Sequence, residues 1–327
     1  MGDIAWIRAS QPEKRPIWGH PNGIQVSLWP CDAEGRPGND GGPRGLLRIG
    51  YPVLPITHAA GLINFIAIEP VVKGVRCYSE LEPSTLREGR GKFIWSGTRG
   101  VSEEKFDQGT LSLLPGTFVE VLRVNLFVEP FVNKARVQLR LEFRSDKPDE
   151  VAITSVAQPG SASMDNCILT ATMGNYMRLR RVWLKDHQAS PLDLWPQQST
   201  HPNGFTDDLY LPAAALLRDA SGGVLACAES NEIDPAAAPP DPQAPWWHFR
   251  GAYPLTQYWR YPDAKTAGTV KLRLNGRKVY WAGTTPIPGG LAFENFDLTA
   301  PFVDSQTFIF GLAKDPAPIL IRRFQSV

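Results

Sequence analysis

The feature that most constrains this chain is a strict alternation of apolar and polar side chains over residues 137–144. Val137, Leu139, Leu141 and Phe143 alternate with Gln138, Arg140, Glu142 and Arg144. A period of two places one set of side chains in a core and the other in water, which is the pattern of a β-strand. Residues 122–128 follow the same rule, and residues 131–134 between the two segments favour a turn. We therefore predict an antiparallel hairpin over 122–143.

The same pattern recurs along the chain. Residues 270–274 alternate, Asn275–Gly276 has the composition of a type I′ turn, and residues 279–281 return as a strand, which predicts a second hairpin. Residues 216–226 predict a third hairpin with its turn at 219–223. Further strands are expected at 168–172, 179–184, 307–312 and 319–321.

Helical patterns are few and short. Residues 79–88 and 102–106 each have the composition of a single helical turn. The 29 glycines and 30 prolines among 327 residues exceed the average usage of ~7% and ~5%, and they interrupt the strand patterns at short intervals. We predict an all-β protein, built as a large antiparallel β-sandwich or a double jelly roll.

The sequence leaves two domain organisations open: a single all-β body over 1–327, or two packed β-sandwich halves of about 1–190 and 191–327. The tetrapeptide His20-Pro21-Asn22-Gly23 recurs as His201-Pro202-Asn203-Gly204. A duplicated half-domain would explain the repeat, and so would chance, because Pro-Asn-Gly is a common turn sequence. If the halves are related, His20 and His201 occupy equivalent corners of the two halves.

Composition excludes several classes of partner. The formal net charge is +1, and no cluster of Lys and Arg stands out, which argues against a protein that binds nucleic-acid phosphates. No apolar run approaches the ~20 residues that cross a bilayer, so we predict a soluble chain without membrane insertion. The first residues lack a signal-peptide pattern, which fits either an unexported protein or a secreted or periplasmic one without its leader. The localisation and the oligomeric state stay open.

Metal and cofactor signatures are absent from the sequence. The four cysteines form no CxxC pair, which argues against a cysteine metal site, and we interpret them as buried free thiols rather than two disulfides. The five histidines are far apart in the chain, so we predict no metal site and no cofactor; a Ca²⁺ site stays open. Hydrolase elbows, zinc-protease motifs and phosphate loops are also missing.

Tryptophan provides the first indication of a ligand. The chain has 10 tryptophans, whose flat apolar rings and hydrogen-bonding edges suit sugar rings. Trp246 and Trp247 follow a proline-rich segment, 233–245, which we interpret as a surface loop or, alternatively, a domain linker. Adjacent residues of a strand point to opposite faces, so both rings cannot enter one core. We expect this pair to contact an oligo- or polysaccharide.

Carboxylates near strand ends suggest chemistry on that saccharide. Glu69 follows a strongly apolar run, Glu294 follows two glycines and a short apolar run, and Glu80 lies in a Glu-x-Glu segment. Glycoside hydrolysis needs two carboxyl groups ~5–9.5 Å apart. Our first hypothesis is therefore a glycoside hydrolase whose catalytic residues are drawn from these three, with His58 near the Glu69 carboxylate.

Two further hypotheses remain. Tyr176, Arg178 and Arg180 share one face of an extended strand, which would suit a polysaccharide lyase in which arginine neutralises a uronate and Tyr176 or His201 removes the adjacent proton. The third hypothesis is a non-catalytic carbohydrate-binding or structural β-sandwich. The composition and turn style are similar to β-sandwich proteins of bacterial carbohydrate utilisation, but no motif assigns a family. His20 and His201 complete the expected saccharide contacts.

Overall fold

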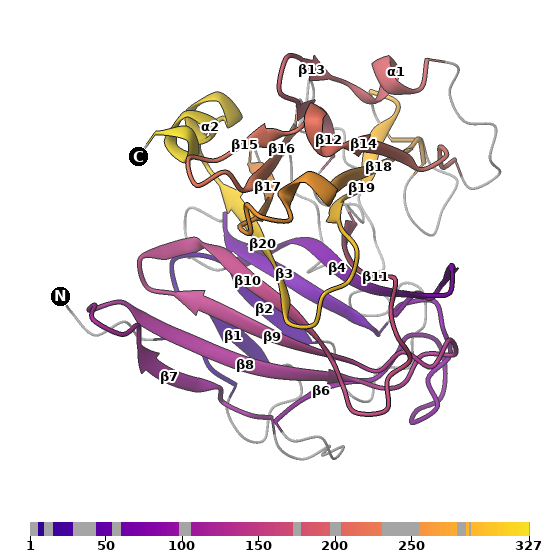
Figure 1. Ribbon diagram of the computed structural model, residues 1–327, viewed down its shortest axis with the longest axis vertical. Coiled ribbons are helices and arrows are strands. Elements are labelled where there is room, and N and C mark those ends of the chain that lie inside the picture. The colour runs from indigo at the N-terminus through magenta and orange to yellow at the C-terminus, as the bar shows by residue number, and fades with distance from the viewer. Residues whose placement is uncertain are drawn as a thin grey trace. The chain divides into compact units, whose positions relative to one another are not determined.

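The computed structural model is a mainly antiparallel β-protein, with 51% of the residues that it describes in strands and 8% in helices. This confirms the predicted all-β class, and its strands are labelled in Figure 1. The structure describes residues 6–9, 16–28, 44–53, 60–97, 106–172, 178–196, 204–230, 255–279, 286–287 and 289–326.

The chain divides into two compact units, and each is assembled from separate stretches of sequence. Unit 1 comprises 1–62, 66–168 and 301–310, and unit 2 comprises 63–65, 169–300 and 311–327. Three strands contribute residues to both units: β4 (Ala60–Val72), β11 (Asn166–Thr172) and β20 (Gln306–Ala313). The predicted halves of about 1–190 and 191–327 stay a prediction.

Unit 1 contains the strand pair that the alternation predicts. Strands β8 (Glu120–Val128) and β9 (Val137–Arg144) pair antiparallel, and the Lys134 amide donates to the Phe131 carbonyl in the turn between them. The next strand, β10 (Lys147–Ala157), pairs with β9. On the other side of β8 lie β6 (Ile94–Ser96) and β7 (Thr110–Leu113), as Figure 1 shows. The predicted hairpin over 122–143 is confirmed.

A second group of strands in unit 1 packs against this meander. It consists of β1 (Ile17–Gly19), β2 (Gln25–Leu28), β3 (Leu46–Pro52), and the hairpin of β4 with β5 (Val75–Arg76). The Ile24 amide donates to the Pro148 carbonyl at 2.8 Å, and the Tyr51 hydroxyl bonds to Asp149 at 2.6 Å. These bonds connect the β1–β3 group to the edge of the meander.

Unit 2 is centred on a run of antiparallel neighbours. Its pairs are β15–β16, β16–β17, β12–β16, β12–β13, β12–β19, β18–β19 and β14–β18. The strands are β12 (Leu179–Trp183), β13 (Gln188–Ala189), β14 (Leu209–Pro212), β15 (Leu217–Arg218), β16 (Val224–Ser230), β17 (Thr256–Tyr261), β18 (Lys271–Arg277) and β19 (Ala292–Thr299). Short helical turns lie at α1 (Pro191–Leu194), Ala213–Ala215 and Ala267–Thr269. The predicted hairpin over 216–226 is confirmed by β15 and β16.

The hairpin predicted at Asn275–Gly276 is wrong. Strand β18 continues through both residues, and the register with β19 shifts between them: Asn275 lies opposite Asn295 and Gly276 opposite Phe293. Glu294 is skipped in this register, so β19 has a bulge at Glu294, opposite Asn275–Gly276. Tertiary pairing overrides the local turn preference here, because the residues before Asn275 and after Gly276 both pair with the same strand, β19.

The strand predicted at 319–321 is also wrong, because this segment lies in helix α2 (Ala317–Gln325). Pro316 precedes the first turn, where a proline is tolerated. Ala317, Leu320 and Ile321 are buried at helical spacing, and they pack with Leu225 of β16 in one cluster. The short apolar run fits a strand as well as a buried helix face, and the packing decides between them.

Other expectations lie partly beyond the described residues. Residues 79–88 form turns and not a helix. The described residues do not include 102–105, 233–245 or 280–281. Cys77, Cys167 and Cys227 are buried free thiols, as expected, and Cys31 lies outside the described residues. Burial raises the pKa of Cys167 to about 12, so this thiol is inert near neutral pH.

Candidate functional site

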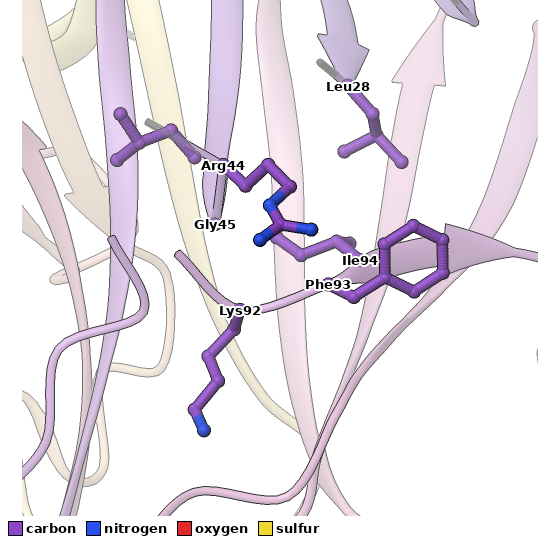
Figure 2. A pocket seen from close by; sticks show the side chains of 7 residues that line it. Leu28, Arg44, Gly45, Lys92, Phe93 and Ile94 are labelled. Carbon is purple, nitrogen blue, oxygen red and sulfur yellow. The ribbon is translucent and has the colours of Figure 1, made fainter. Parts of the chain in front are cut away.

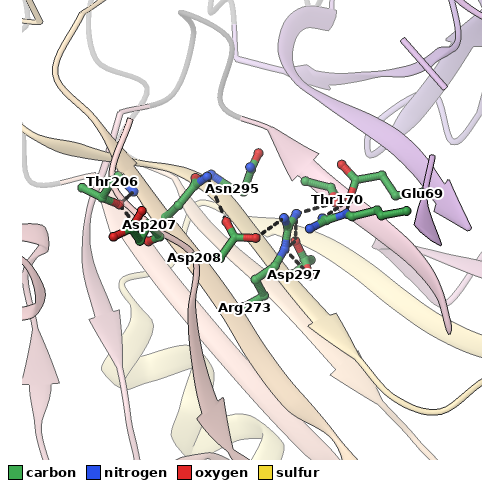
Figure 3. A network of polar contacts seen from close by, with 11 residues as sticks. Glu69, Thr170, Thr206, Asp207, Asp208, Arg273, Asn295 and Asp297 are labelled. Carbon is green, nitrogen blue, oxygen red and sulfur yellow. Dashed lines mark hydrogen bonds and ion pairs between the residues drawn. The ribbon is translucent and has the colours of Figure 1, made fainter. Parts of the chain in front are cut away.

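A ladder of buried polar side chains runs along the β18–β19 pair of unit 2. Its rungs are Arg273 with Asp297, Asn275 with Asn295, and Arg277 with Glu294. The apolar Leu272 and Leu274 project from the opposite face of β18 into the core, since neighbouring side chains of a strand alternate. We call these six residues the polar ladder; Figure 3 shows part of it.

Arg273 is the centre of the first rung. Its Nε and Nη2 atoms donate to Asp297 Oδ2 at 3.0 and 2.8 Å, and Nη1 donates to Asp208 Oδ2 at 3.2 Å. Nη2 also donates to the Thr170 hydroxyl at 2.8 Å. The guanidinium is thus held by β11, β19 and the segment before β14, and its role is to fix these elements relative to one another.

The second rung attaches the segment before β14. Asn275 Nδ2 donates to Asp208 Oδ1 at 3.2 Å, and its Oδ1 accepts from the Asn295 amide at 3.0 Å. The Gly276 amide donates to the Thr206 hydroxyl at 2.7 Å, and the Thr206 amide donates to the Gly276 carbonyl at 2.8 Å. Both backbone polar groups of Gly276 thus hold the segment before β14.

The third rung is the ion pair between Arg277 and Glu294, with 2.9 Å between Nη1 and Oε1. Both side chains are only 3% exposed. The Arg277 guanidinium also stands 5.1 Å from the centroid of the Phe205 ring, a cation–π distance. Charges buried to this extent are costly unless paired, so a pair at the end of a sheet is a candidate functional site.

Two further arginines belong to the same end of unit 2. Arg178 is 0% exposed and directly precedes β12, whose Leu179 pairs with Phe293 of β19. Arg180 is half-buried, and its Nη1 donates to the Leu291 carbonyl at 3.2 Å. We call Arg178, Arg180, Arg277 and Glu294 the arginine end.

A glycine allows Arg180 to reach this position. Gly289 has a φ of +77°, and a Cβ atom there would stand 3.1 Å from Arg180 Nη2. Any other residue would be strained and would crowd the guanidinium. The Arg180 side chain thus packs directly against the Gly289 backbone.

Several strands start or stop at the arginine end. Leu179 of β12 lies opposite Ser230 of β16 and Phe293 of β19, and Arg277 of β18 lies opposite Ala292 of β19. The chain connections that leave this end, 173–177, 231–254 and 280–285, lie outside the described residues. Among the predicted site residues, Arg178, Arg180 and Glu294 are thus brought together.

The other two acid candidates belong to unit 1. Glu69 of β4 is buried, and its Oε2 accepts from Arg76 Nε at 2.8 Å. The Arg76 guanidinium stands 5.2 Å from the Tyr78 ring centroid. Glu80 is half-buried in the turns after β5. The catalytic roles of Glu69, Glu80 and Glu294 stay predictions.

His20 occupies a turn of unit 1. Its Nδ1 accepts from the Asn22 amide at 3.1 Å, and its ring meets Trp6 edge-on at 5.6 Å between centroids. Burial lowers the pKa of His20, and the Asp149 carboxylate opposes this shift. The neutral ring thus serves as an acceptor that closes the turn.

The remaining predicted contacts cannot be placed. Tyr176, His58, His201, Trp246 and Trp247 lie outside the described residues, and their roles stay predictions.

Sequence analysis did not single out Arg273, Arg277, Asp208 or Asp297. On a strand pattern, arginines that alternate with leucines indicate a water-facing surface. The available signal was the second strand of the pair: its Glu294-Asn295-Phe296-Asp297 carries the complementary charges. Opposite charges on two paired strands indicate cross-strand ion pairs.

A small hollow in unit 1 is lined by Leu28, Arg44, Gly45, Leu46, Lys92, Phe93 and Ile94. Figure 2 shows Arg44 reaching toward Phe93 and Ile94, while the Lys92 side chain points away. Arg44 Nη2 donates to the Glu88 carbonyl, so this guanidinium anchors the 79–91 turns.

No group of three or more His, Cys, Asp or Glu side chains in the described ranges is placed to hold a metal ion. In the same ranges, no helix has the length and apolar character to cross a membrane. Comparison of the chain with protein-family models, with curated proteins and with solved structures finds no match. The function of the protein is therefore inferred from the residues of the site.

Proposed function

We propose that the protein is a carbohydrate-active enzyme that acts on an acidic saccharide at the arginine end of unit 2. The observation that carries this proposal is the presence of three arginines, Arg178, Arg180 and Arg277, at the same end of unit 2 as Glu294, which pairs with Arg277. Guanidinium groups bind carboxylates with two parallel hydrogen bonds, which suits a uronate. The tryptophan-rich composition supports a sugar as the rest of the ligand.

Within this site Arg180 is the most exposed arginine: it is half-buried, whereas Arg178 and Arg277 are buried. We therefore propose Arg180 as the ligand-binding group. A fixed positive charge of this kind would neutralise a uronate carboxylate and stabilise the charge that develops when the neighbouring proton is removed. The reaction class is then β-elimination, with Tyr176 or His201 as the proposed base.

The test is incubation with acidic polysaccharides (polygalacturonate, alginate, hyaluronan) and with neutral ones (xylan, mixed-linkage glucan). Elimination creates an unsaturated uronate that absorbs in the ultraviolet, and the summed product masses equal the substrate mass. Arg180→Ala should reduce the rate by about 100-fold, as does loss of one transition-state donor. Arg123→Ala is the matched control, because Arg123 is a half-buried arginine of β8 in unit 1. Activity on neutral glycans alone, or equal effects of both variants, would overturn the proposal.

Glycoside hydrolysis is the second candidate, and the position of Glu294 favours it. A buried carboxylate oriented by Arg277 is held as an anion, as a nucleophile or base requires. Glu294→Gln keeps an acceptor oxygen for Arg277 and removes the charge, so it should abolish hydrolysis. Hydrolysis adds one water to the summed product masses, which distinguishes it from elimination. Retention on a glycan array without any product would leave a non-catalytic carbohydrate-binding protein.

A further inference from the structure

Unit 1 buries three charged side chains at one end of the β6–β8 pair. Lys92 precedes β6 and is 1% exposed, and Glu129 follows β8 and is 0% exposed. The Glu129 amide donates to the Phe93 carbonyl at 3.1 Å, which fixes the two backbone segments side by side. The third group, Glu82, lies in the turns between β5 and β6 with a 12% exposed side chain.

Two acceptors contact the Lys92 amine, and a third, the Glu129 carboxylate, lies beside it. Its Nζ atom is 3.1 Å from Glu82 Oε2 and 3.1 Å from the Pro83 carbonyl. Glu129 Oε1 is 3.7 Å from the same nitrogen. The Phe131 ring centroid lies 5.8 Å away, so the amine is enclosed by an apolar wall and two carboxylates.

The Glu129 carboxylate is surrounded by hydrogen-bond donors. Oε2 accepts from the Ser84 hydroxyl at 2.9 Å and from the Leu86 amide at 3.3 Å, and Oε1 accepts from the Thr85 amide at 3.2 Å. Preorganised backbone donors around a carboxyl group are the arrangement that stabilises the oxyanion of a tetrahedral intermediate. They also keep the Glu129 carbon at a fixed distance from Lys92.

We propose that Lys92 and Glu129 condense into an intramolecular isopeptide bond, with Glu82 as the proton carrier. Glu82 takes a proton from the Lys92 ammonium, and the freed amine attacks Cδ of Glu129. One Glu129 oxygen then leaves as water, with the proton carried by Glu82 and a second proton from the nitrogen. Ammonium and carboxylate thus become one amide and one water, and no other reactant is needed.

Burial and proximity both favour this reaction. Two ions in an interior bear a desolvation cost that a neutral amide does not bear. Holding amine and carboxyl in contact replaces a bimolecular encounter with a unimolecular step. Glu82 is closer to the amine and accepts from the Val132 amide at 3.1 Å, whereas three donors, from Ser84, Thr85 and Leu86, meet Glu129. The larger set of oxyanion donors assigns Glu129 as the acceptor.

The experiment is intact-mass measurement of the purified full-length protein under denaturing conditions. We expect a mass one water below the sequence mass. Trypsin should release a branched peptide that joins 91–99 to 124–134, since the acylated lysine resists cleavage. A full sequence mass with only linear peptides would show a buried salt bridge and overturn the proposal. A branched peptide that contains 77–87 would overturn the assignment to Glu129.

Variants test the roles separately. Lys92→Arg keeps the positive charge but should restore the full mass. The exposed Lys271, at the start of β18, is the control: Lys271→Arg should keep the loss of water. Glu129→Gln should form the same amide with loss of ammonia in place of water. Glu82→Gln should abolish the bond. If the branched peptide persists in Glu82→Gln, Glu82 is not the proton carrier. Whether the Lys92–Glu129 bond exists is decided by the peptide map of the wild-type protein.

Discussion

Arg273 and Asp297 stand opposite each other on β18 and β19, and their side chains form an ion pair of 2.8 Å inside unit 2. Removing one partner leaves the other charge buried without compensation. We expect Asp297→Asn to lower the free energy of unfolding by about 3–5 kcal/mol, measured by urea denaturation. The exposed Asp186→Asn should change it by less than about 0.5 kcal/mol. Equal effects of the two variants would contradict a stabilising role for the buried Arg273–Asp297 ion pair.

Helix α2 offers a second comparison, between neighbouring residues. Leu320 is 2% exposed and packs in the cluster with Ala317 and Leu225, whereas Ile319 is 44% exposed. Leu320→Ala should lower the free energy of unfolding by about 2–5 kcal/mol, because it removes a buried side chain and leaves a cavity. Ile319→Ala should have a much smaller effect. In a strand Ile319 and Ile321 would share one face, so equal costs of Ile319→Ala and Ile321→Ala would contradict the helix, in which Ile321 is buried and Ile319 is exposed.

The contact between Gly311 and Tyr258 gives a third prediction. A Cβ atom on Gly311 would lie 2.0 Å from Tyr258 Cζ, so the ring packs directly on the glycine backbone. Gly311→Ala should lower the melting temperature by several degrees, since overpacking costs about 1–3 kcal/mol. Gly268→Ala is the control, because nothing lies within 4 Å of its Cβ position. A neutral Gly311→Ala would show that Tyr258 can move without cost.

His20 makes stability depend on pH. Burial lowers its pKa in the folded protein below the ordinary histidine value of 6.5, and Asp149 only partly offsets this. The folded state therefore binds the proton less readily than the unfolded state does. The contribution is fully present above about pH 6.5 and is lost as the pH falls toward the folded pKa.

The measurement is urea denaturation of wild type and His20→Asn at a series of pH values. An asparagine at this position retains an acceptor for the Asn22 amide but does not titrate. The difference between the two unfolding free energies should thus shrink as the pH falls below about 6.5. Parallel pH profiles would contradict the lowered pKa of His20.

The alternation over 137–144 was sufficient to predict the β8–β9 hairpin, because its partner lies a few residues away and both faces are specified locally. The predictions for Asn275–Gly276 and 319–321 failed for the opposite reason. Their conformations depend on β19 and on the packing of Leu225, which no local window contains. A turn dipeptide and a short apolar run each fit two structures.

The site was predictable only in part. Glu294, Arg178 and Arg180 were selected as polar residues near strand ends or on a strand face, and the structure brings them to one end of unit 2. Arg273 and Arg277 were missed because a charged residue in an alternating strand normally faces water. Only the pairing of β18 with β19 shows that each charge has a partner and that both faces of the strand are buried.

The interleaving of the two units has a consequence for biosynthesis. Unit 1 includes 301–310, where the Phe302 amide bonds to the Asp165 carbonyl and Thr307 bonds to Thr154 of β10. A nascent chain therefore exposes the outer edge of β10 until nearly all of the protein has left the ribosome. Truncation before residue 301 leaves that edge open to strands of other chains, so premature termination yields an aggregation-prone product and not a smaller domain.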